Sequence, residues 1–384
     1  MKKALISSLL ICAAMQLSGC SFDRYSTGDI SKNPKAVCLD INDINDLKRL
    51  PFYELELKSH NETLKVTFNE SDKNSKIDNF IKKIKATVKP GTKVEFAVIY
   101  TFKSLIREID TGGNKTFSVK YQTSLVSSDS QVLIPVEFPN GRKYIAYLDT
   151  GCPGYGMLTS DIVIDNNLEV IPKFGVCKVP LLNIGQAQIK DGIAYYDEQQ
   201  WQFRVLNIPL YKYSPAILGR EFIRSFDYVM FDNVHKKAVF SKEDEFTPDN
   251  PQSWSSYPFI EDPNGGNTIV VKIPLAGKVL DIAFDSCWGE PGLFINKKHW
   301  EAVKQDLSFK LHGKSNGTTY QGMKLPCRKA TISRLSIGEK TLKNAKVNIS
   351  DDPNGYSVIG LDYFQDTSVV LDYVKNLFWI KKTK

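Results

Sequence analysis

The sequence predicts a mainly β protein in which one β unit occurs twice along the chain. Its apolar stretches are short and are followed by turn residues, as at 132–138, after which Pro-Asn-Gly follows. A second observation is internal similarity, because residues 141–150 align with residues 277–286 without a gap. The third is that each aligned segment ends in an aspartate and a hydroxyl residue, Asp149-Thr150 and Asp285-Ser286. We therefore expect two β units with matching aspartate turns.

The repeat extends well beyond these turns. Four landmarks recur in the same order, which argues against chance similarity. They are residues 141–150 with 277–286, 156–158 with 292–294, 182–185 with 335–338, and 216–219 with 357–360. Each copy then has a short helix and closes on two apolar strands, at 228–240 and 368–380. The expected units are 121–245 and 264–384, joined by a proline-punctuated linker over 246–263.

The chain upstream of the repeat predicts a small α+β domain over residues 37–120. Ile77, Phe80, Ile81 and Ile84 have the i, i+3, i+4, i+7 spacing of an amphipathic helix. Residues 94–100 have the composition of a strand. No residue pattern assigns this domain a function.

The first residues predict export and lipidation. Lys2 and Lys3 precede an uncharged stretch, and residues 17–20 read Leu-Ser-Gly-Cys, which resembles the lipobox of bacterial lipoproteins. The alternatives are a plain signal peptide and a membrane anchor, but the stretch is too short and too interrupted for a span. We expect a signal peptide over 1–19, lipid on Cys20 and a tether over 20–36. Ser21, in place of aspartate, favours the outer membrane, with the protein facing the periplasm or the surface.

Asp149 and Asp285 are the candidate catalytic residues. Two carboxylates held a few ångströms apart share one proton, because both cannot ionise at that distance. The ionised member can then activate a water, while the protonated member donates to a carbonyl oxygen. The hydroxyls of Thr150 and Ser286 would bond across the two loops and fix the carboxylates. This chemistry needs no metal and no cofactor, and none is expected.

The pattern of residues 125–384 resembles the retropepsin-like and pepsin-like aspartic peptidases. An apolar strand ending in Asp-Thr-Gly, a later apolar-Leu-Gly and a closing strand pair are all present in the first copy. The resemblance implies one β lobe per copy, a cleft between the lobes, and Gly151 as a supporting residue. The second copy departs from it, with Cys287 where the family has a glycine that allows close approach of the backbone.

The resemblance also implies a flap hairpin that closes over a peptide. Residues 313–322 have the glycine-rich composition of such a flap, and Tyr320 is its candidate contact residue. An ordinary surface hairpin explains the same composition equally well.

The cysteines have matching positions in the two copies. Each copy has one cysteine close after its aspartate and another before its Ile-Gly or Leu-Gly element. Because exported proteins retain disulfides, we expect Cys152–Cys177 and Cys287–Cys327, although four cysteines allow three connectivities. A third Asp-Thr-Gly, at Asp110, is followed by Gly113 and predicts a hairpin turn instead of a catalytic loop.

The sequence lacks the motifs of other classes of hydrolase. The sequence has no H-E-x-x-H zinc motif and no G-x-S-x-G nucleophile motif. We interpret the net charge of +7 as an excess spread along the chain that serves solubility, with no nucleic-acid partner. The sequence thus predicts a lipid-anchored envelope aspartic endopeptidase with a peptide or protein substrate. The alternative is an inactive protein of the same fold that binds peptides or assists assembly.

Overall fold

The computed structural model describes most of the chain after residue 107. The described part covers 108–122 and 131–383, with gaps at 153, 172–175, 198–201, 206–207, 213–215, 243–244, 263–267, 289–291 and 319–323. Upstream it describes residues 37–38, 54–58, 63–67, 95–100 and single helical positions between 75 and 86. The expected signal peptide, Cys20 and the tether lie outside the described residues. No helix in the described part is long and apolar enough to cross a membrane.

A separate four-stranded antiparallel sheet forms from the upstream segments. Its order is β1 (Val37–Cys38), β4 (Glu95–Tyr100), β2 (Glu54–Lys58) and β3 (Thr63–Thr67). The strand expected at 94–100 is therefore confirmed as β4. Polar positions of the expected helix, such as Lys76 and Lys83, are helical and exposed, while its four apolar positions lie outside the described residues.

The first copy forms a closed ring of six strands. Around the ring the order is β7, β8, β15, β9, β12 and β11, and β11 pairs back with β7. The six strands are β7 (Leu133–Glu137), β8 (Lys143–Leu148), β9 (Gly156–Thr159), β11 (Val176–Ile184), β12 (Ala187–Asp197) and β15 (Ala216–Leu218). The remaining elements of this part of the chain are α3 (Ser160–Asp165), β10 (Val170–Ile171), the hairpin of β13 (Gln202–Val205) and β14 (Ile208–Lys212), and α4 (Arg220–Arg224). The helix expected after Gly219 is confirmed as α4.

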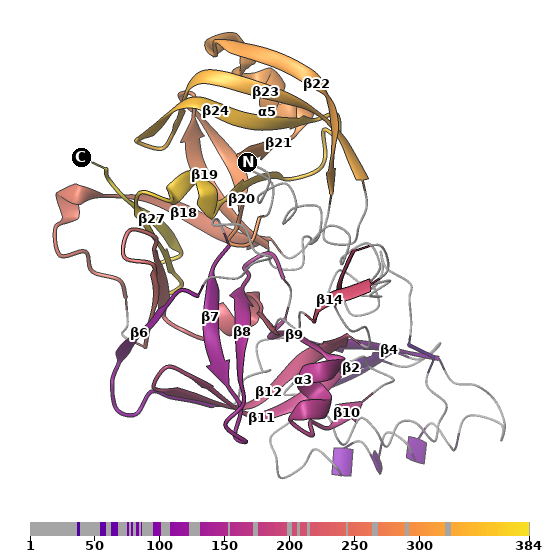
Figure 1. Cartoon of the computed structure of the whole chain (residues 1–384). Coiled ribbons are helices and arrows are strands. Elements are labelled where there is room, and N and C mark those ends of the chain that lie inside the picture. Colours follow the sequence, from indigo (N-terminus) through magenta and orange to yellow (C-terminus); the bar gives the residue numbers. More distant parts are fainter. Residues whose placement is uncertain are drawn as a thin grey trace.

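The second copy forms a ring with the same order and the same strand directions. Its order is β19, β20, β25, β21, β24 and β23, and β23 pairs back with β19. In both rings the strand leading to the aspartate runs parallel to the strand ending at Leu218 or Gly360. The elements are β19 (Thr268–Leu275), β20 (Lys278–Asp285), β21 (Leu293–Ile295), α5 (Lys297–Val303), η7 (Lys304–Asp306), β22 (Phe309–Thr318), β23 (Lys324–Ile337), β24 (Lys340–Ser350), β25 (Ser357–Gly360) and η8 (Leu361–Phe364). Figure 1 shows the two rings at opposite ends of the molecule.

One landmark of the sequence repeat has a clear steric reason. A Cβ atom built on Gly156 would lie 1.8 Å from the carbonyl oxygen of Ile217, and one built on Gly292 would lie 1.9 Å from that of Lys346. No side chain fits at these distances, so each copy needs glycine where one strand passes closely over another. The neighbouring strand differs, since Ile217 lies on β15 whereas Lys346 lies on β24, the counterpart of β12.

An antiparallel sheet of six strands joins the two rings. Its order is β6 (Thr116–Lys120), β17 (Lys237–Ser241), β16 (Tyr228–Asp232), β26 (Ser368–Asp372), β27 (Leu377–Lys381) and β18 (Trp254–Asp262). At its centre Met230 pairs with Val370, the residue that corresponds to it in the other copy. Tyr228 pairs with Asp372, and Asp232 pairs with Ser368. This reciprocal register places a local two-fold axis between Met230 and Val370.

Two expected boundaries were wrong because strand pairing crosses them. The segment 246–263, expected to be a linker, contains β18, which pairs with both β19 and β27. Residues before 121 also belong to the first copy, since β5 (Glu108–Asp110) pairs with β12 and β6 pairs with β17. The sequence between them does form the expected turn, in which Gly112 N–H donates to Asp110 Oδ1 at 2.9 Å. It is not a hairpin, because β5 and β6 belong to different sheets.

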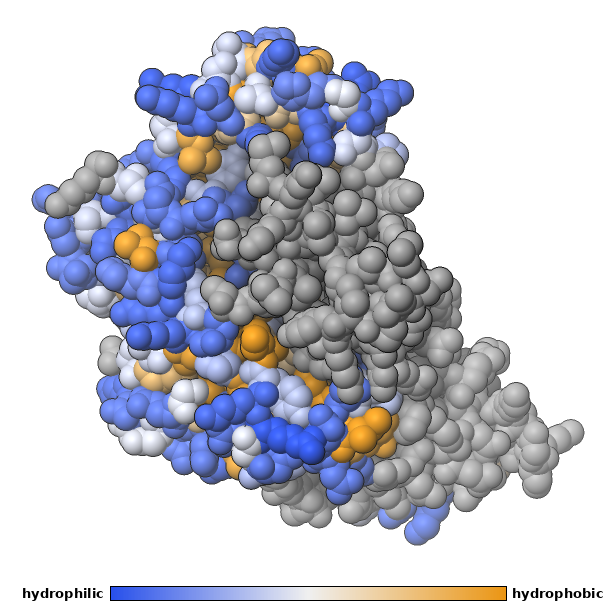
Figure 2. Space-filling model, viewed as in Figure 1, coloured by the Kyte–Doolittle hydropathy of each residue, from blue (hydrophilic) through white to orange (hydrophobic). Residues whose placement is uncertain are grey.

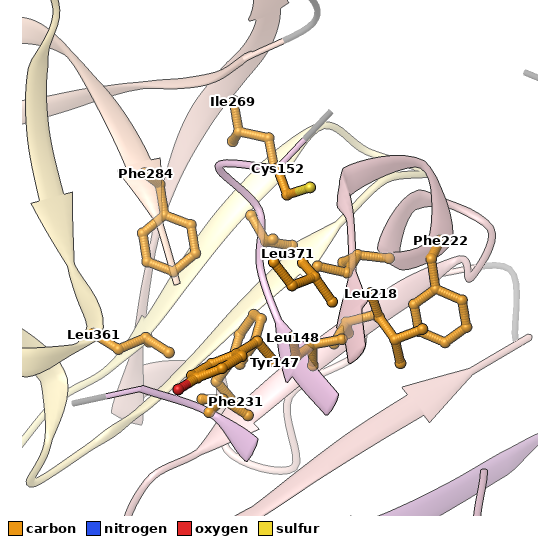
Figure 3. Close-up of a cluster of buried hydrophobic side chains, with 14 of the residues drawn as sticks. Tyr147, Leu148, Cys152, Leu218, Phe222, Phe231, Ile269, Phe284, Leu361 and Leu371 are labelled. Atoms are coloured by element: carbon orange, nitrogen blue, oxygen red, sulfur yellow. The ribbon is translucent and has the colours of Figure 1, made fainter. Parts of the chain in front are cut away.

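A large hydrophobic core is shared by both copies, and a smaller separate cluster contains Phe246, Trp254 and Val370. The rings of Phe231 and Phe284, from different copies, lie 6.1 Å apart, and Phe284 lies 4.9 Å from Phe378. Figure 3 shows Phe231, Phe284, Leu148 and Leu371 in this cluster, with Cys152 beside it. The core therefore reaches the strand ends that carry the two aspartates.

One part of the second copy is rich in positive charge. The strands β22, β23 and β24 carry nine Lys and Arg residues and no Asp or Glu. Hydrophilic residues cover much of this end of the molecule in Figure 2. The excess of positive charge is therefore larger on these three strands than its distribution along the chain led us to expect.

Candidate active site

The two aspartates occupy the same place in the two rings. Asp149 directly follows β8, and its N–H donates to Leu218 O at 2.9 Å. Asp285 is the last residue of β20 and is aligned with Gly360 of the parallel strand β25. Each carboxyl is therefore held at the end of a buried strand by a parallel neighbour, which fixes its position through backbone bonds.

The structure brings the two carboxyl groups together. Asp149 and Asp285 lie close enough for each side chain to act on the pKa of the other. Gly151 of the first loop packs against the same carboxyl, since a Cβ built on it would lie 2.5 Å from Asp285 Oδ2. Two buried carboxyl groups this close cannot both ionise readily, so they share a proton.

Backbone N–H groups hold the carboxyl groups in matching ways. Asp149 Oδ1 accepts from Gly151 N–H at 2.8 Å and from Cys152 N–H at 3.1 Å. Asp285 Oδ1 accepts from Cys287 N–H at 2.9 Å. Each loop thus turns its backbone donors toward its own aspartate.

The hydroxyl residues bond reciprocally between the two loops. Thr150 N–H donates to Ser286 Oγ at 2.9 Å, and Ser286 N–H donates to Thr150 Oγ1 at 2.9 Å. The hydroxyls in turn donate across the loops, Thr150 to Phe284 O at 3.1 Å and Ser286 to Leu148 O at 2.6 Å. Both side chains are buried. These are the cross-loop bonds that the sequence led us to expect, and they fix the two aspartate turns relative to each other.

Burial makes ionisation of the pair costly. It raises the pKa of Asp149, which the negative charge of Asp285 raises further. Burial also raises the pKa of Asp285, while its bonds from Cys287 N–H and Asp149 and the charge of Arg220 act in the opposite direction. The two carboxyl groups therefore hold a proton between them at a pH where a free carboxyl is ionised.

Cys287 does not disturb its loop as the loss of glycine suggested. Its N–H bond to Asp285 Oδ1 is close in length to the corresponding bond from Gly151 N–H, 2.9 Å against 2.8 Å. Its Sγ donates to Leu148 O at 3.4 Å, and Gln131 Nε2 donates to its carbonyl oxygen at 3.5 Å. Burial, together with the charge of Asp149, raises the pKa of the Cys287 thiol, which therefore stays protonated.

The expected disulfides are not formed in the structure. None of the four described cysteines, Cys152, Cys177, Cys287 and Cys327, is joined to another. Cys177 instead donates from Sγ to Ala194 O at 3.7 Å. The pairing within each copy stays a prediction from the matching positions in the repeat.

The structure describes only part of the candidate flap. Strands β22 and β23 form a long hairpin, with Ser315 opposite Cys327 and Thr318 opposite Lys324. Its tip, with Tyr320, lies outside the described residues. The corresponding pair in the first copy, β10 and β11, is much shorter, with Val170 opposite Cys177.

Arg220 is a site residue that the sequence interpretation missed. It is only 3% exposed, and its Nη2 donates to Gly151 O at 3.3 Å. The available signal was a charged residue directly after the apolar Leu218-Gly219 landmark, where the other copy has Leu361. The internal repeat draws attention to residues that the two copies share. Arg220 was missed because the second copy has a different residue, Leu361, at that position.

Two comparisons with known proteins identify no relative. No protein-family model matches the chain, and no curated protein is significantly similar to it. Within the described residues no group of three or more His, Cys, Asp or Glu side chains is arranged to hold a metal ion. The function therefore has to be inferred from the chemistry of the site itself.

Proposed function

We propose that residues 108–383 form two retropepsin-like lobes that together hydrolyse peptide bonds with a water activated between Asp149 and Asp285. The observation that carries the proposal is the close approach of the two carboxyl groups, since Gly151 donates to Asp149 Oδ1 and packs against the Asp285 carboxyl. The matching rings support it, because they give each copy one aspartate at an equivalent strand end. The reciprocal bonds of Thr150 and Ser286 support it further, because they hold the two loops together.

The chemistry follows from the shared proton. The ionised carboxylate takes a proton from water as the water oxygen attacks the amide carbon. The protonated carboxyl donates to the carbonyl oxygen, which gives a neutral tetrahedral intermediate. Proton transfer to the nitrogen then allows the C–N bond to break, and the pair returns to its starting state.

Digestion of a peptide library over a range of pH tests the proposal. We expect the wild type to cut peptides, and Asp149→Asn and Asp285→Asn each to lower the rate by about 10²–10⁴-fold. Asp281→Asn is the matched control, since Asp281 is exposed on the same strand β20 and should leave the rate unchanged. Full activity in either dyad variant would sink the two-aspartate mechanism.

The second candidate is a protein that retains this fold to bind peptides or assist assembly without cutting them. Cys287 in place of the family glycine is the observation that favours it. Peptide binding without cleavage by the folded wild type, unchanged in Asp285→Asn, would select this alternative.

We further propose that the protein is anchored in the bacterial envelope by lipid on Cys20, after removal of residues 1–19. The support is the Leu-Ser-Gly-Cys sequence alone. Labelling with a radioactive fatty acid in the producing bacterium, compared with Cys20→Ser, would show whether the lipid is present.

A further inference from the structure

One face of the strands β22, β23 and β24 carries three exposed lysines. Thr331 on β23 lies directly opposite Lys310 on β22 and directly opposite Lys346 on β24. Residues in directly opposed positions project to the same face of a sheet, so the two lysines stand on either side of Thr331. Lys329 is two residues away on β23 and joins them on this face. All three lysines are exposed, and together they define the lysine face of the sheet.

The opposite face of the same strands packs on the core. Ala330 and Ile332 of β23 and Val347 of β24 are all buried. Because neighbouring residues of a strand alternate between the two faces, the lysines point away from the core and into solvent. His312 lies on the lysine face too, since its Nε2 is 2.8 Å from Thr331 Oγ1. Figure 1 shows these strands at one end of the molecule, where the face is open to a large partner.

The charge of the lysine face is not compensated by its surroundings. The three strands contain no Asp or Glu, and none of the three lysines forms an ion pair with another described residue. Three acidic residues beside the strand ends have basic partners of their own: Asp306 with Lys278 at 3.5 Å, Glu339 with Lys382 at 2.9 Å, and Asp351 with Arg328 at 4.0 Å.

The three charges act together on a partner that approaches this face. Neighbouring strands lie about 4.8 Å apart, so the backbones at Lys310 and Lys346 are about 10 Å apart. That spacing is close to the Debye length of about 8–10 Å at physiological ionic strength, so their fields add.

The composition of the lysine face favours an extended anionic surface over a protein partner. Thr331 and Asn348 lie directly beside the lysines, in positions where a protein interface would carry aromatic or apolar residues. Lysine is depleted in protein interfaces, which are built around such residues. Lysines near an anionic membrane surface, in contrast, contribute to binding without a pocket or an apolar contact.

We propose that the lysine face docks on the surface of a bilayer that contains anionic phospholipids. The phosphate groups of the lipid headgroups supply the negative charge that the three strands lack, and phosphates beside the lysines reduce the repulsion between them. This binding does not depend on peptidase activity, and it is separate from the lipid proposed on Cys20.

Sedimentation with lipid vesicles tests the proposal. The protein is the expected mature chain, residues 20–384, carrying Cys20→Ser so that no attached lipid contributes to binding. Vesicles of phosphatidylglycerol and phosphatidylcholine in equal parts are compared with vesicles of phosphatidylcholine alone. We expect the protein to sediment with the anionic vesicles at low salt and to stay in solution with the neutral ones. High salt should release it, because ions screen the attraction between exposed charges.

A combined variant assigns the binding to the lysine face. Lys310→Gln, Lys329→Gln and Lys346→Gln together should lower partition into the anionic vesicles by about 100-fold, since each lysine near such a surface contributes about fivefold. The matched control removes the same charge from three exposed lysines elsewhere and should stay close to the wild type. It combines Lys120→Gln, Lys236→Gln and Lys272→Gln. Substitutions at exposed positions of this kind leave the fold intact.

Three results would overturn the inference. The first is a wild type that does not bind anionic vesicles at low salt, or that binds neutral vesicles equally well. The second is an equal loss of binding in the two combined variants, which would mean that net charge alone is responsible. The third is retention on immobilised polyglutamate without binding to anionic vesicles, which would make the partner an acidic protein segment instead of a bilayer.

Discussion

At the scale of single residues, the protein holds Asp149 and Asp285 in buried positions. Burial disfavours their ionised form, which water would stabilise. Because burial raises the pKa of both, the folded state binds more protons than the unfolded state between about pH 4 and the raised values. Stability therefore falls as pH rises through this range. Functional sites often carry such a cost, since the geometry that activates a water also strains the fold.

Asp149→Asn should therefore stabilise the protein at neutral pH while it removes one carboxyl of the proposed dyad. The neutral amide keeps the shape of the carboxyl but carries no buried charge, and a pKa raised by one unit corresponds to about 1.4 kcal/mol of free energy. Unfolding in urea at about pH 4, 6 and 8 should show a gain that grows with pH. Asp281→Asn should show no such trend, and a gain of equal size at every pH would contradict the explanation.

At the scale of elements, the strands β22, β23 and β24 hold pairs of like charges that repel each other. Arg334 on β23 lies directly opposite Lys343 on β24, and Lys314 on β22 lies directly opposite Arg328 on β23. Like charges in directly opposed positions destabilise a sheet. Arg334 and Lys343 are exposed, and neither forms an ion pair with another described residue.

Lys343→Glu should convert one of these repulsions into an attraction. We expect the free energy of unfolding of Lys343→Glu to exceed that of Lys343→Gln by about 0.2–1 kcal/mol at low salt. The difference should shrink in high salt, because exposed charges are screened. Equal stability of the glutamate and glutamine variants at low salt would show that the pair contributes nothing.

At the scale of the whole molecule, the two copies are joined by a shared core, a common sheet and the bonds between the aspartate loops. Thr150 and Ser286 each satisfy the backbone N–H of the other, and both are buried. Losing either hydroxyl leaves a buried N–H without its partner, which costs about 1–3 kcal/mol.

Thr150→Val and Ser286→Ala should each destabilise by about that amount, and together by less than the sum. The two hydroxyls serve one set of bonds, so removal of the first already weakens what the second contributes. A double-mutant cycle by urea unfolding measures the coupling. Thr341→Val, which removes an exposed hydroxyl bonded to Ser336, is the control and should stay within about 0.5 kcal/mol of the wild type. Strict additivity of the two site variants would mean that the loops are not coupled through these bonds.

The sequence by itself determined the repeat, the mainly β class, the positions of most strands and turns, and the two aspartates with their hydroxyls. These features depend on local patterns, such as short apolar runs ended by turn residues, or on a fixed spacing between the two copies. Both kinds of pattern can be recognised in a single sequence. It also located the glycines at 156 and 292, although only the structure shows which carbonyl group each one approaches.

Only the tertiary structure decided which segments meet. It made the expected linker into strand β18, added β5 and β6 to the first copy, and attached Arg220 to the loop of Asp149. It also showed how Cys287 keeps its loop bond without glycine, and it placed like charges opposite each other on β23 and β24. The physical reason is the same in each case, because strand pairing and burial are contacts between residues far apart in the chain, and no local pattern specifies the partner.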